Sequence, residues 1–445
     1  MDYTQLSETD VQQMLTTIGV DSIDALFAPI KSEQRFKGQL DVPPGISELE
    51  LLRELESLAG RNAPVTENVC FLGGGAYDHF IPTIVDHLCM QSEFLTAYTP
   101  YQAEASQGSL QVFYEFQTMI CQLTGMDVSN ASLYELASAA AEAVLMARSI
   151  TGKRRVIMSK AAHPDCNRVL DTYVRELPIE PVHANIKEGV TDLDHLRSLL
   201  TNDTACVVVQ SPNFFGCLER VDQIVKLAHD AGALVIQAVD PISCGVLKRP
   251  GDLGVDIVVA EGQPLGIPLQ YGGPWLGILA CRAEYLRRMP GRVVGVTHDK
   301  QDRRGFCLVL QTREQHIKRE RATSNVCTNQ GLLAIRASVY MAAVGRQGLA
   351  MVASQCLDKA HYAASQIAKI PGFSLAFQQP FFKEFAVRSS KPVEKVLEAC
   401  RAKGILAGVP LVRWFPQLHD TFLVAVTEKR TRGEIDTLVA ALRAA

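Results

Sequence analysis

Between residues 62 and 320, short apolar runs alternate with stretches of helical periodicity, and this alternation constrains the fold more than any other feature. The runs are 155–158, 206–209, 233–239, 257–260 and 276–280. Continuous apolar runs of this length are typical of strands buried on both faces of a mainly parallel sheet. Helical stretches lie between most of them, such as 193–200, and two more, 112–123 and 137–147, precede them, which predicts a doubly wound α/β domain.

The segments on either side of this region predict a different architecture. Residues 1–61 contain short helices, one capped by Ser7 and closed by Gly19 and another over 48–58, but too little apolar area to fold alone. Near the C-terminus, strand-like segments at 382–388 and 421–426 flank a helix over 393–402. We therefore expect an N-terminal helical arm (1–61), a large α/β domain (62–330) and a small C-terminal α+β domain (331–445).

Composition argues against several classes of protein. The 445 residues carry a net charge of only −4, so the chain lacks a basic surface for nucleic acid or an anionic membrane. No apolar run approaches the ~20 residues that a membrane helix needs, and the polar N-terminus does not resemble a secretory signal. The 12 cysteines are scattered singly, which indicates reduced thiols in a cytoplasmic protein rather than disulfides or a metal site.

Two loops are candidate binding segments. The loop Tyr98-Thr99-Pro100-Tyr101-Gln102 could present its hydroxyls at a defined angle, because proline fixes φ, or it could be a solvent-facing turn. The run Gly73-Gly74-Gly75 could cradle a phosphate. It lacks a following Lys-Ser/Thr and the Gly-x-Gly-x-x-Gly spacing, which favours a flexible turn before a helix over 77–88.

Two further polar residues follow predicted strands. Asp240 comes directly after the strand over 233–239, and a carboxylate at the carboxyl end of a parallel strand points into the crevice where such sheets bind ligands. In pyridoxal-phosphate (PLP) enzymes an aspartate there holds the pyridinium nitrogen protonated. Asp240 also precedes a proline, so a simple turn is the alternative. His163 is a second candidate for the same crevice and stays unassigned.

Residues 311–325 form the densest polar run of the chain, with charges of alternating sign. As a simple helix this run would be a solvated face with surface ion pairs. Arg313 and His316 could share one side of that helix and hold a carboxylate.

Together these residues resemble one family, the P-protein of the glycine cleavage system, and specifically its N-terminal half in organisms where the protein is split into two subunits. The resemblance runs from the N-terminal arm into the small domain. The matching segments read YTPYQ at 98–102 with Glu104 and SQG at 106–108, FQTM at 116–119, LTGM at 123–126, NAS at 130–132, EGQPLGIP at 261–268, YGGP at 271–274, LQTREQHI at 310–317 and ATSNVCTNQ at 322–330.

The resemblance implies the aspartate-aminotransferase type of PLP fold, fold type I, in which the working subunit carries a Schiff-base lysine. Here the lysine position falls at Gln263 or Pro264, and no lysine occurs between Lys248 and Lys300. Neither glutamine nor proline supplies the primary amine that a Schiff base needs. We therefore expect no catalytic residue acting independently and no PLP bound covalently to this chain, with Asp240 a vestigial cofactor residue.

A second departure from the family concerns the start of the helix over 137–147. Family members tend to have an Asp-Gly pair where this chain has Glu135-Leu136. Leucine prevents close approach of the backbone to a phosphate at a helix start, and Glu135 would repel a phosphate. Independent binding of the cofactor is therefore further disfavoured.

As the resemblance implies, the assembled enzyme decarboxylates glycine with PLP on a lysine of the second subunit, releases CO₂, and passes the aminomethyl group to the lipoyl arm of the H-protein. The T- and L-proteins complete the system. This chain would contribute the heteromer's architecture and part of the active-site wall, with Tyr98, Tyr101, Gln102, Arg313 and His316 as candidates. The alternatives are a structural or regulatory PLP-fold homologue and a self-sufficient PLP enzyme with a displaced lysine.

Overall fold

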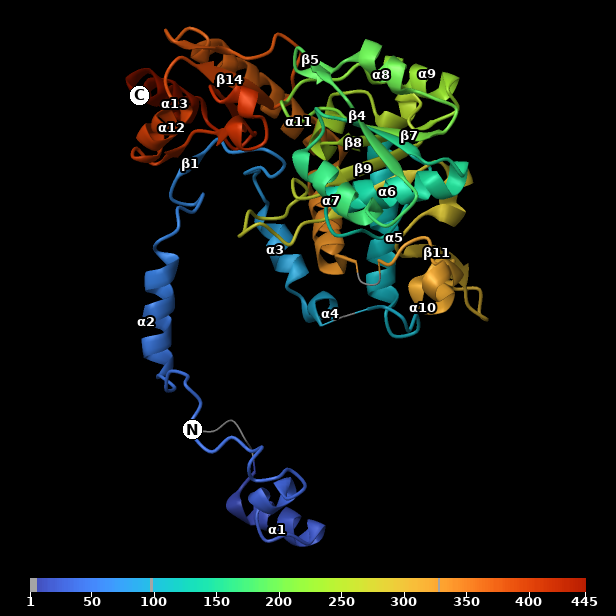
Figure 1. Cartoon of the computed structure of the whole chain (residues 1–445), viewed down its shortest axis with the longest axis vertical. Helices are drawn as coiled ribbons and strands as arrows, with labels where there is room; N and C mark the ends of the chain where they lie inside the picture. The colour runs from blue at the N-terminus through green and yellow to red at the C-terminus, as the bar shows by residue number, and fades with distance from the viewer. Residues whose placement is uncertain (1–5, 97–98, 327–328) are drawn as a thin grey trace. The chain divides into compact units, whose positions relative to one another are not determined.

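The structure is a computed structural model that describes residues 6–96, 99–326 and 329–445 (Figure 1). The chain divides into two compact units, Met1–Ala63 and Pro64–Ala445. The expected boundary between a large domain and a small domain near residue 330 stays a prediction. Among the described residues, no helix is both long enough and apolar enough to cross a membrane.

The first unit contains the predicted short helices. They are α1 (Glu8–Ile18), a 3₁₀ turn (Ile23–Phe27) and α2 (Glu48–Ala59). Ser7 caps α1 through a reciprocal pair of hydrogen bonds with Asp10, and Gly19 closes it in the left-handed conformation with φ 82°. Helix α2 buries none of its residues, and its five leucines, at 49, 51, 52, 55 and 58, are 45–59% exposed.

The second unit is built on a seven-stranded sheet with the strand order β2-β10-β9-β8-β7-β3-β4. All five predicted runs are strands of this sheet. Strands β9, β8, β7, β3 and β4 are parallel to one another, whereas β10 runs antiparallel to both of its neighbours. The bounds are β2 (Val128–Ser129), β3 (Arg155–Ser159), β4 (Glu180–Ala184), β7 (Thr204–Gln210), β8 (Leu234–Val239), β9 (Ile257–Glu261) and β10 (Gly277–Cys281).

Both faces of the sheet are covered, which is why its strands are continuously apolar. Ile157 and Val207 belong to one core cluster, and their chain neighbours Met158 and Val208 belong to the other. The first cluster includes residues of α5 (Gln107–Thr124), α8 (Leu193–Leu199), α9 (Val221–Asp230) and α11 (Gly331–Ile367). The second includes residues of α6 (Leu136–Thr151) and α7 (Pro164–Val174).

The C-terminal segment forms a second sheet with the strand order β13-β14-β17-β16, seen with α12 and α13 in the orange and red part of Figure 1. Helix α11 is interrupted at Gly345, where φ is 61°, and its second half packs on this sheet. The bounds are β13 (Phe373–Leu375), β14 (Glu384–Ser389), α12 (Val393–Arg401), β16 (Val409–Pro410), β17 (Thr421–Ala425) and α13 (Arg432–Ala444).

Short elements connect these layers. Strand β1 (Val69–Cys70) pairs with β15 (Ile405–Leu406), so the start of the second unit is hydrogen-bonded to its C-terminal part. Two antiparallel ladders lie outside the main sheets, β5 (Ile186–Lys187) with β6 (Val190–Thr191) and β11 (Val293–His298) with β12 (Arg304–Val309). Helices α3 (Thr83–Cys89) and α4 (Ser92–Leu95) precede the 98–102 loop.

One predicted helix starts later than expected, and one segment considered as a possible helix does not form one. The helix expected over 77–88 begins only at Thr83, and residues 77–82 are irregular. The polar run over 311–325 is not one helix, because it breaks into a 3₁₀ turn (Gln311–Arg313), the short α10 (Gln315–Lys318) and a second 3₁₀ turn (Arg319–Arg321). Leu310 and Arg319, with φ of 55° and 54°, interrupt any continuous helix there.

Candidate functional site

Asp240 lies at the carboxyl end of β8 and lines a small cavity of ≈ 30 Å³. His163, Glu261, Pro264, Lys383 and Glu384 line the same cavity. A volume of this size accommodates one or two water molecules. The crevice that the parallel sheet predicts is therefore present, but it is almost completely filled by the chain's own side chains.

The carboxylate of Asp240 has two partners. One oxygen accepts a hydrogen bond from the Ile242 N–H at 3.0 Å and so caps the turn that begins at the following proline. The other lies 2.7 Å from the ammonium nitrogen of Lys383. Asp240 therefore caps a turn and also faces the crevice, while its role as a vestigial cofactor residue stays a prediction.

Gln263, one of the two candidates for the expected lysine position, is only 1% exposed, and its side-chain amide is fully hydrogen-bonded. Its amide oxygen accepts from the Tyr77 N–H at 2.9 Å, and its amide nitrogen donates to the carbonyls of Tyr77 at 3.0 Å and Ile267 at 2.8 Å. The side chain therefore pairs with the backbone of residue 77 much as a neighbouring strand would. Pro264, next to it, contributes to the cavity wall.

Lys383 is the residue that fills the crevice, and its side chain is 1% exposed. Besides Asp240, its ammonium lies 2.8 Å from His79 Nε2 and 3.7 Å from the centroid of the Tyr77 ring. A buried ammonium needs a partner for each of its three N–H groups, and a carboxylate, an imidazole nitrogen and an aromatic face meet that need here.

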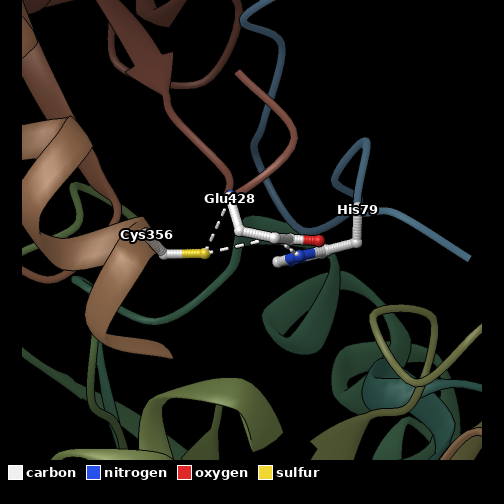
Figure 2. Close-up of side chains that lie close together, drawn as sticks. All are labelled: His79, Cys356 and Glu428. Carbon is white, nitrogen blue, oxygen red and sulfur yellow. Dashed lines mark hydrogen bonds and ion pairs between the residues drawn. The ribbon is translucent and has the colours of Figure 1, made fainter. Parts of the chain in front are cut away.

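The side chains of His79, Cys356 and Glu428 form a second cluster beside Lys383 (Figure 2). His79 Nδ1 lies 2.6 Å from a Glu428 carboxylate oxygen, which is also 3.3 Å from the Cys356 sulfur. Lys383 can only donate to His79 Nε2, so the Nδ1 of His79 carries the imidazole proton and donates it to Glu428.

The pKa values of both His79 and Glu428 are lowered. Burial lowers the pKa of His79, and the neighbouring Lys383 ammonium lowers it further. Burial alone would raise the pKa of Glu428, but the hydrogen bonds from His79 and from the Phe80 N–H outweigh it and bring the pKa to about 2. His79, Cys356 and Glu428 are residue types that bind metals, yet an ammonium in contact with the histidine opposes a second cation.

Glu384 closes the other side of the crevice. Its carboxylate accepts hydrogen bonds from the Gly74 N–H at 2.7 Å and from the Tyr77 hydroxyl at 2.9 Å. Burial raises the pKa of Glu384 to about 7. A Cβ at Gly73 would lie 2.1 Å from this carboxylate. The glycine run therefore receives a side chain of the C-terminal segment rather than a phosphate.

The N-terminus of α6 also receives carboxylates of the chain itself. Glu135 caps the helix by accepting from the Ser138 N–H at 2.8 Å, and Glu261 accepts from the Leu136 N–H at 3.2 Å. Burial raises the pKa of Glu261 to about 8 although three backbone N–H groups donate to it. This agrees with the expectation that Glu135 and Leu136 disfavour a phosphate at this helix.

His163 lines the cavity from the N-terminus of α7. Its Nδ1 accepts from the Asp165 N–H at 3.2 Å, so Nε2 carries the proton and donates to the Gly74 carbonyl at 2.8 Å. Burial lowers the pKa of His163. Its ring contacts Phe214 edge to face, with the ring centroids 5.0 Å apart. The imidazole is thus a neutral part of the wall with both nitrogens engaged.

The predicted wall residues lie elsewhere. The hydroxyl of Tyr101 accepts from Arg292 Nη2 at 3.0 Å, and the guanidinium lies 5.1 Å from the ring centroid. The rings of Tyr101 and His316 are 6.4 Å apart and meet edge to face. Gln102 is exposed, and Tyr98 lies outside the described residues. None of the described candidates lines the Asp240 cavity.

Arg313 does not share a carboxylate-binding face with His316. Its guanidinium donates to the backbone carbonyls of Met289, Gly291 and Leu310. His316 instead lies 3.6 Å from Glu314. Arg313 therefore holds together backbone segments around the end of β12. The polar group at the 98–102 loop consists of Tyr101 with its two contacts, Arg292 and His316.

Comparison with known proteins gives the family. The model of the glycine cleavage system P-protein matches residues 1–442. The chain is 48% identical over 442 residues to a probable glycine dehydrogenase (decarboxylating) subunit 1 of Desulfitobacterium hafniense, covering 99% of each protein. It is 49% identical to the protein so named in Anoxybacillus flavithermus, covering 98% of this chain and 97% of that one.

The chain belongs to the glycine cleavage system P-protein family. Its structure agrees, since it matches a crystal structure of glycine decarboxylase (P-protein) in inhibitor-bound form with a TM-score of 0.92, 39% identity and full coverage of both chains. A sphingosine-1-phosphate lyase of Burkholderia pseudomallei, with a TM-score of 0.66 and 16% identity, shares the fold alone. The expected PLP fold type I is confirmed.

The cofactor of this fold does not fit the pocket of this chain. Gln263 offers no amine, and Lys383 lies where Asp240 would receive the pyridinium nitrogen. The helix N-terminus that would take the phosphate holds Glu135 and Glu261. The cavity of ≈ 30 Å³ is also too small for a pyridine ring with its phosphate.

Several residues of this pocket are not among the site residues predicted from the sequence. Lys383 and Glu384 lie in the strand-like segment predicted over 382–388, and Tyr77 and His79 lie in the segment predicted to be a helix over 77–88. Lys383 and His79 are 304 positions apart. A local signal did exist, since Lys383-Glu384 interrupts an otherwise apolar strand, and charged residues are rarely buried unless they are paired.

Proposed function

We propose that this chain is the cofactor-free subunit of a two-subunit glycine dehydrogenase (decarboxylating) and is active only with its partner. Relatives named as subunit 1 of that enzyme, 48–49% identical over nearly the whole chain, support the assignment. The observation that supports this division of roles is that the expected lysine position falls at Gln263 or Pro264, neither of which has an amine, and that the Gln263 side chain makes three hydrogen bonds to backbone.

The second subunit would carry PLP on its lysine, and PLP supplies an electron sink when a bond at the glycine α-carbon breaks. The carboxyl group leaves as CO₂, and the aminomethyl group passes to the lipoylated H-protein, which works with the T- and L-proteins of the glycine cleavage system. We place the complex in the cytoplasm, on the basis of the singly scattered cysteines in the sequence of this chain.

This chain's share of the active site is the group around the 98–102 loop. Tyr101 accepts a hydrogen bond from Arg292 and keeps its own phenolic proton for donation. The guanidinium adds positive potential beside the hydroxyl, which favours the glycine carboxylate there. Gln102 follows Tyr101 in the sequence, and the His316 ring contacts the Tyr101 ring. Tyr98 belongs to the proposal on the sequence alone, and Arg313 would act by fixing the backbone behind this group.

Reconstitution tests the proposal. Glycine-dependent CO₂ release, with lipoylated H-protein present, would be measured for this chain, for the second subunit and for both. We expect turnover only with both. If this chain adds nothing to an active second subunit, the structural or regulatory alternative holds. If this chain alone turns over glycine, it is self-sufficient with a displaced lysine.

A further inference from the structure

Every polar direction around the Lys383 ammonium is occupied by the chain itself. Asp240 lies 2.7 Å away, His79 Nε2 lies 2.8 Å away, and the Tyr77 ring centroid lies at 3.7 Å. Glu384 is a further anionic group of the same pocket, and Glu428 is bound through the far side of His79. Because the Lys383 side chain is 1% exposed and has this set of partners, its ammonium is a buried, ion-paired group held in one position.

The backbone around Lys383 is as firmly fixed as its side chain. The Lys383 carbonyl accepts from the Val426 N–H at 2.8 Å, and the preceding Pro380 carbonyl accepts from the Leu218 N–H at 2.8 Å. Gly216, with φ +84°, packs so closely that a Cβ there would lie 1.8 Å from the Glu384 carbonyl oxygen. Lys383 therefore projects from a strand start that is held against the end of the main sheet.

We propose that Lys383 is the resident cation of the Asp240 pocket: its ammonium takes the place where a PLP enzyme of this fold holds the pyridinium nitrogen, and it fastens the C-terminal strands to the main sheet. The pocket is then an internal ion-pair site with its own ligand, and PLP is excluded from it. This inference does not depend on the proposed function, since it concerns the pocket and not turnover.

The opposite end of the pocket follows the same pattern. The N–H groups at the start of α6, where a phosphate would bind, receive Glu261 and Glu135 instead. Carboxyl groups thus stand at the phosphate end and an ammonium at the pyridinium end. Because both ends are satisfied from within, the pocket is closed without any ligand.

Lys383 is also badly placed to be the displaced Schiff-base lysine of a self-sufficient enzyme. In PLP, the ring nitrogen and the aldehyde carbon lie at opposite ends of the ring. An aspartate that pairs with the ring nitrogen is therefore at the end away from the aldehyde. The Lys383 nitrogen is in contact with Asp240 itself, and hence at the end away from the aldehyde. Reaction with PLP would require the lysine to leave its three partners.

The test compares full-length chains carrying Lys383→Ala, Lys383→Met, Asp240→Asn or both of the last two changes. Lys395→Ala, an exposed lysine on α12, is the matched control. We expect each single change in the pair to lower the melting temperature by about 3–5 °C, since a buried charge loses its partner. The Met/Asn double variant should melt above either single variant, because no unpaired charge remains.

Ethylammonium chloride then probes the vacated site. It should raise the melting temperature of Lys383→Ala relative to sodium chloride at the same concentration, and leave wild type and Lys383→Met unchanged, because methionine still fills the space. Equal effects on all three proteins would overturn the proposal. The proposal would also be overturned if Lys383→Ala melted at the same temperature as the Lys395→Ala control. A Met/Asn double variant that is less stable than both single variants, or that is unfolded when both of them fold, would overturn it as well.

Borohydride reduction of wild type with PLP supplies an independent arm. We expect no stoichiometric adduct on the peptide that contains Lys383. Stoichiometric reduction onto that lysine would overturn the assignment of a resident cation and favour the self-sufficient enzyme. All of these results could be as expected while the two subunits together still fail to decarboxylate glycine. Failure of the proposed function can therefore be distinguished from failure of this inference.

Discussion

Tyr101→Phe removes one hydroxyl oxygen and keeps the aromatic ring. The ring continues to face the Arg292 guanidinium at 5.1 Å, so packing and cation–π contact persist. What is lost is the acceptor 3.0 Å from Arg292 Nη2, on an arginine that is 5% exposed, together with the phenolic proton that the proposed function directs at the charged glycine carboxylate. A hydrogen bond to a charged group contributes about 1.5–3 kcal/mol. If it acts mainly in the transition state, glycine turnover falls roughly ten- to more than a hundredfold.

The assay is glycine-dependent CO₂ release by the assembled two-subunit enzyme, with complex formation checked by size-exclusion chromatography. Tyr114→Phe is the matched control, since it makes the same change on α5, where the Tyr114 ring packs against Phe306 at 5.5 Å. We expect wild-type turnover from the control. Tyr101→Phe turnover equal to that of the control in a fully assembled complex would refute the active-site role. Loss of assembly with Tyr101→Phe would make the loop an interface instead.

Three further outcomes are expected. Burial raises the pKa of Glu142 from its ordinary 4.5 to about 7, so the stability of its protonated form is complete below pH 4.5 and is lost as the pH rises through 7. Glu142→Gln should therefore raise the free energy of unfolding at pH 8 by up to about 3 kcal/mol, seen as a higher melting temperature. At pH 4.5 the substitution should change both quantities little. Gly216→Ala should destabilise the chain by more than the ~1–2 kcal/mol of a left-handed alanine, because its Cβ would overlap a carbonyl. Gly152→Ala, also at positive φ but with no atom within 4 Å of its Cβ, should cost only that amount in a denaturant titration. Deleting residues 1–40 should raise the dissociation constant for the second subunit, since an obligate interface commonly buries ~2,000 Å² or more and this segment has exposed apolar side chains. An unchanged constant by analytical ultracentrifugation would contradict that role.

The main sheet could be predicted from the sequence because its strands are buried on both faces. A run such as residues 206–209 is apolar at every position only if helices cover both sides, and the two core clusters confirm this. The antiparallel direction of β10 could not be predicted, because an apolar run carries no information on direction. Helix ends with local caps, such as Ser7 and Gly19, were equally predictable.

The segment over 77–82 was mispredicted for a physical reason. Its side chains are held by residues from the far end of the chain, with Asp78 bonded to Lys429 at 2.8 Å and to Arg430 at 3.0 Å. His79 is bonded to Lys383 and Glu428. These tertiary contacts override a helical pattern that looks sufficient locally. The same holds for the pocket, whose acidic and basic groups come from segments that only the fold brings together.

The filled pocket limits how this chain can take part in catalysis. A site that binds no ligand cannot couple ligand binding to movement of the C-terminal strands, because the ion pair between Lys383 and Asp240 fastens them in the absence of any ligand. The chain therefore contributes through groups that are fixed before assembly. The Tyr101 side chain, 53% exposed but anchored by the buried Arg292, combines the two properties that such a role needs. Preorganised groups of this kind lower a barrier only where they meet developing charge, and in the proposed complex these groups would meet it at a cofactor held by the second subunit.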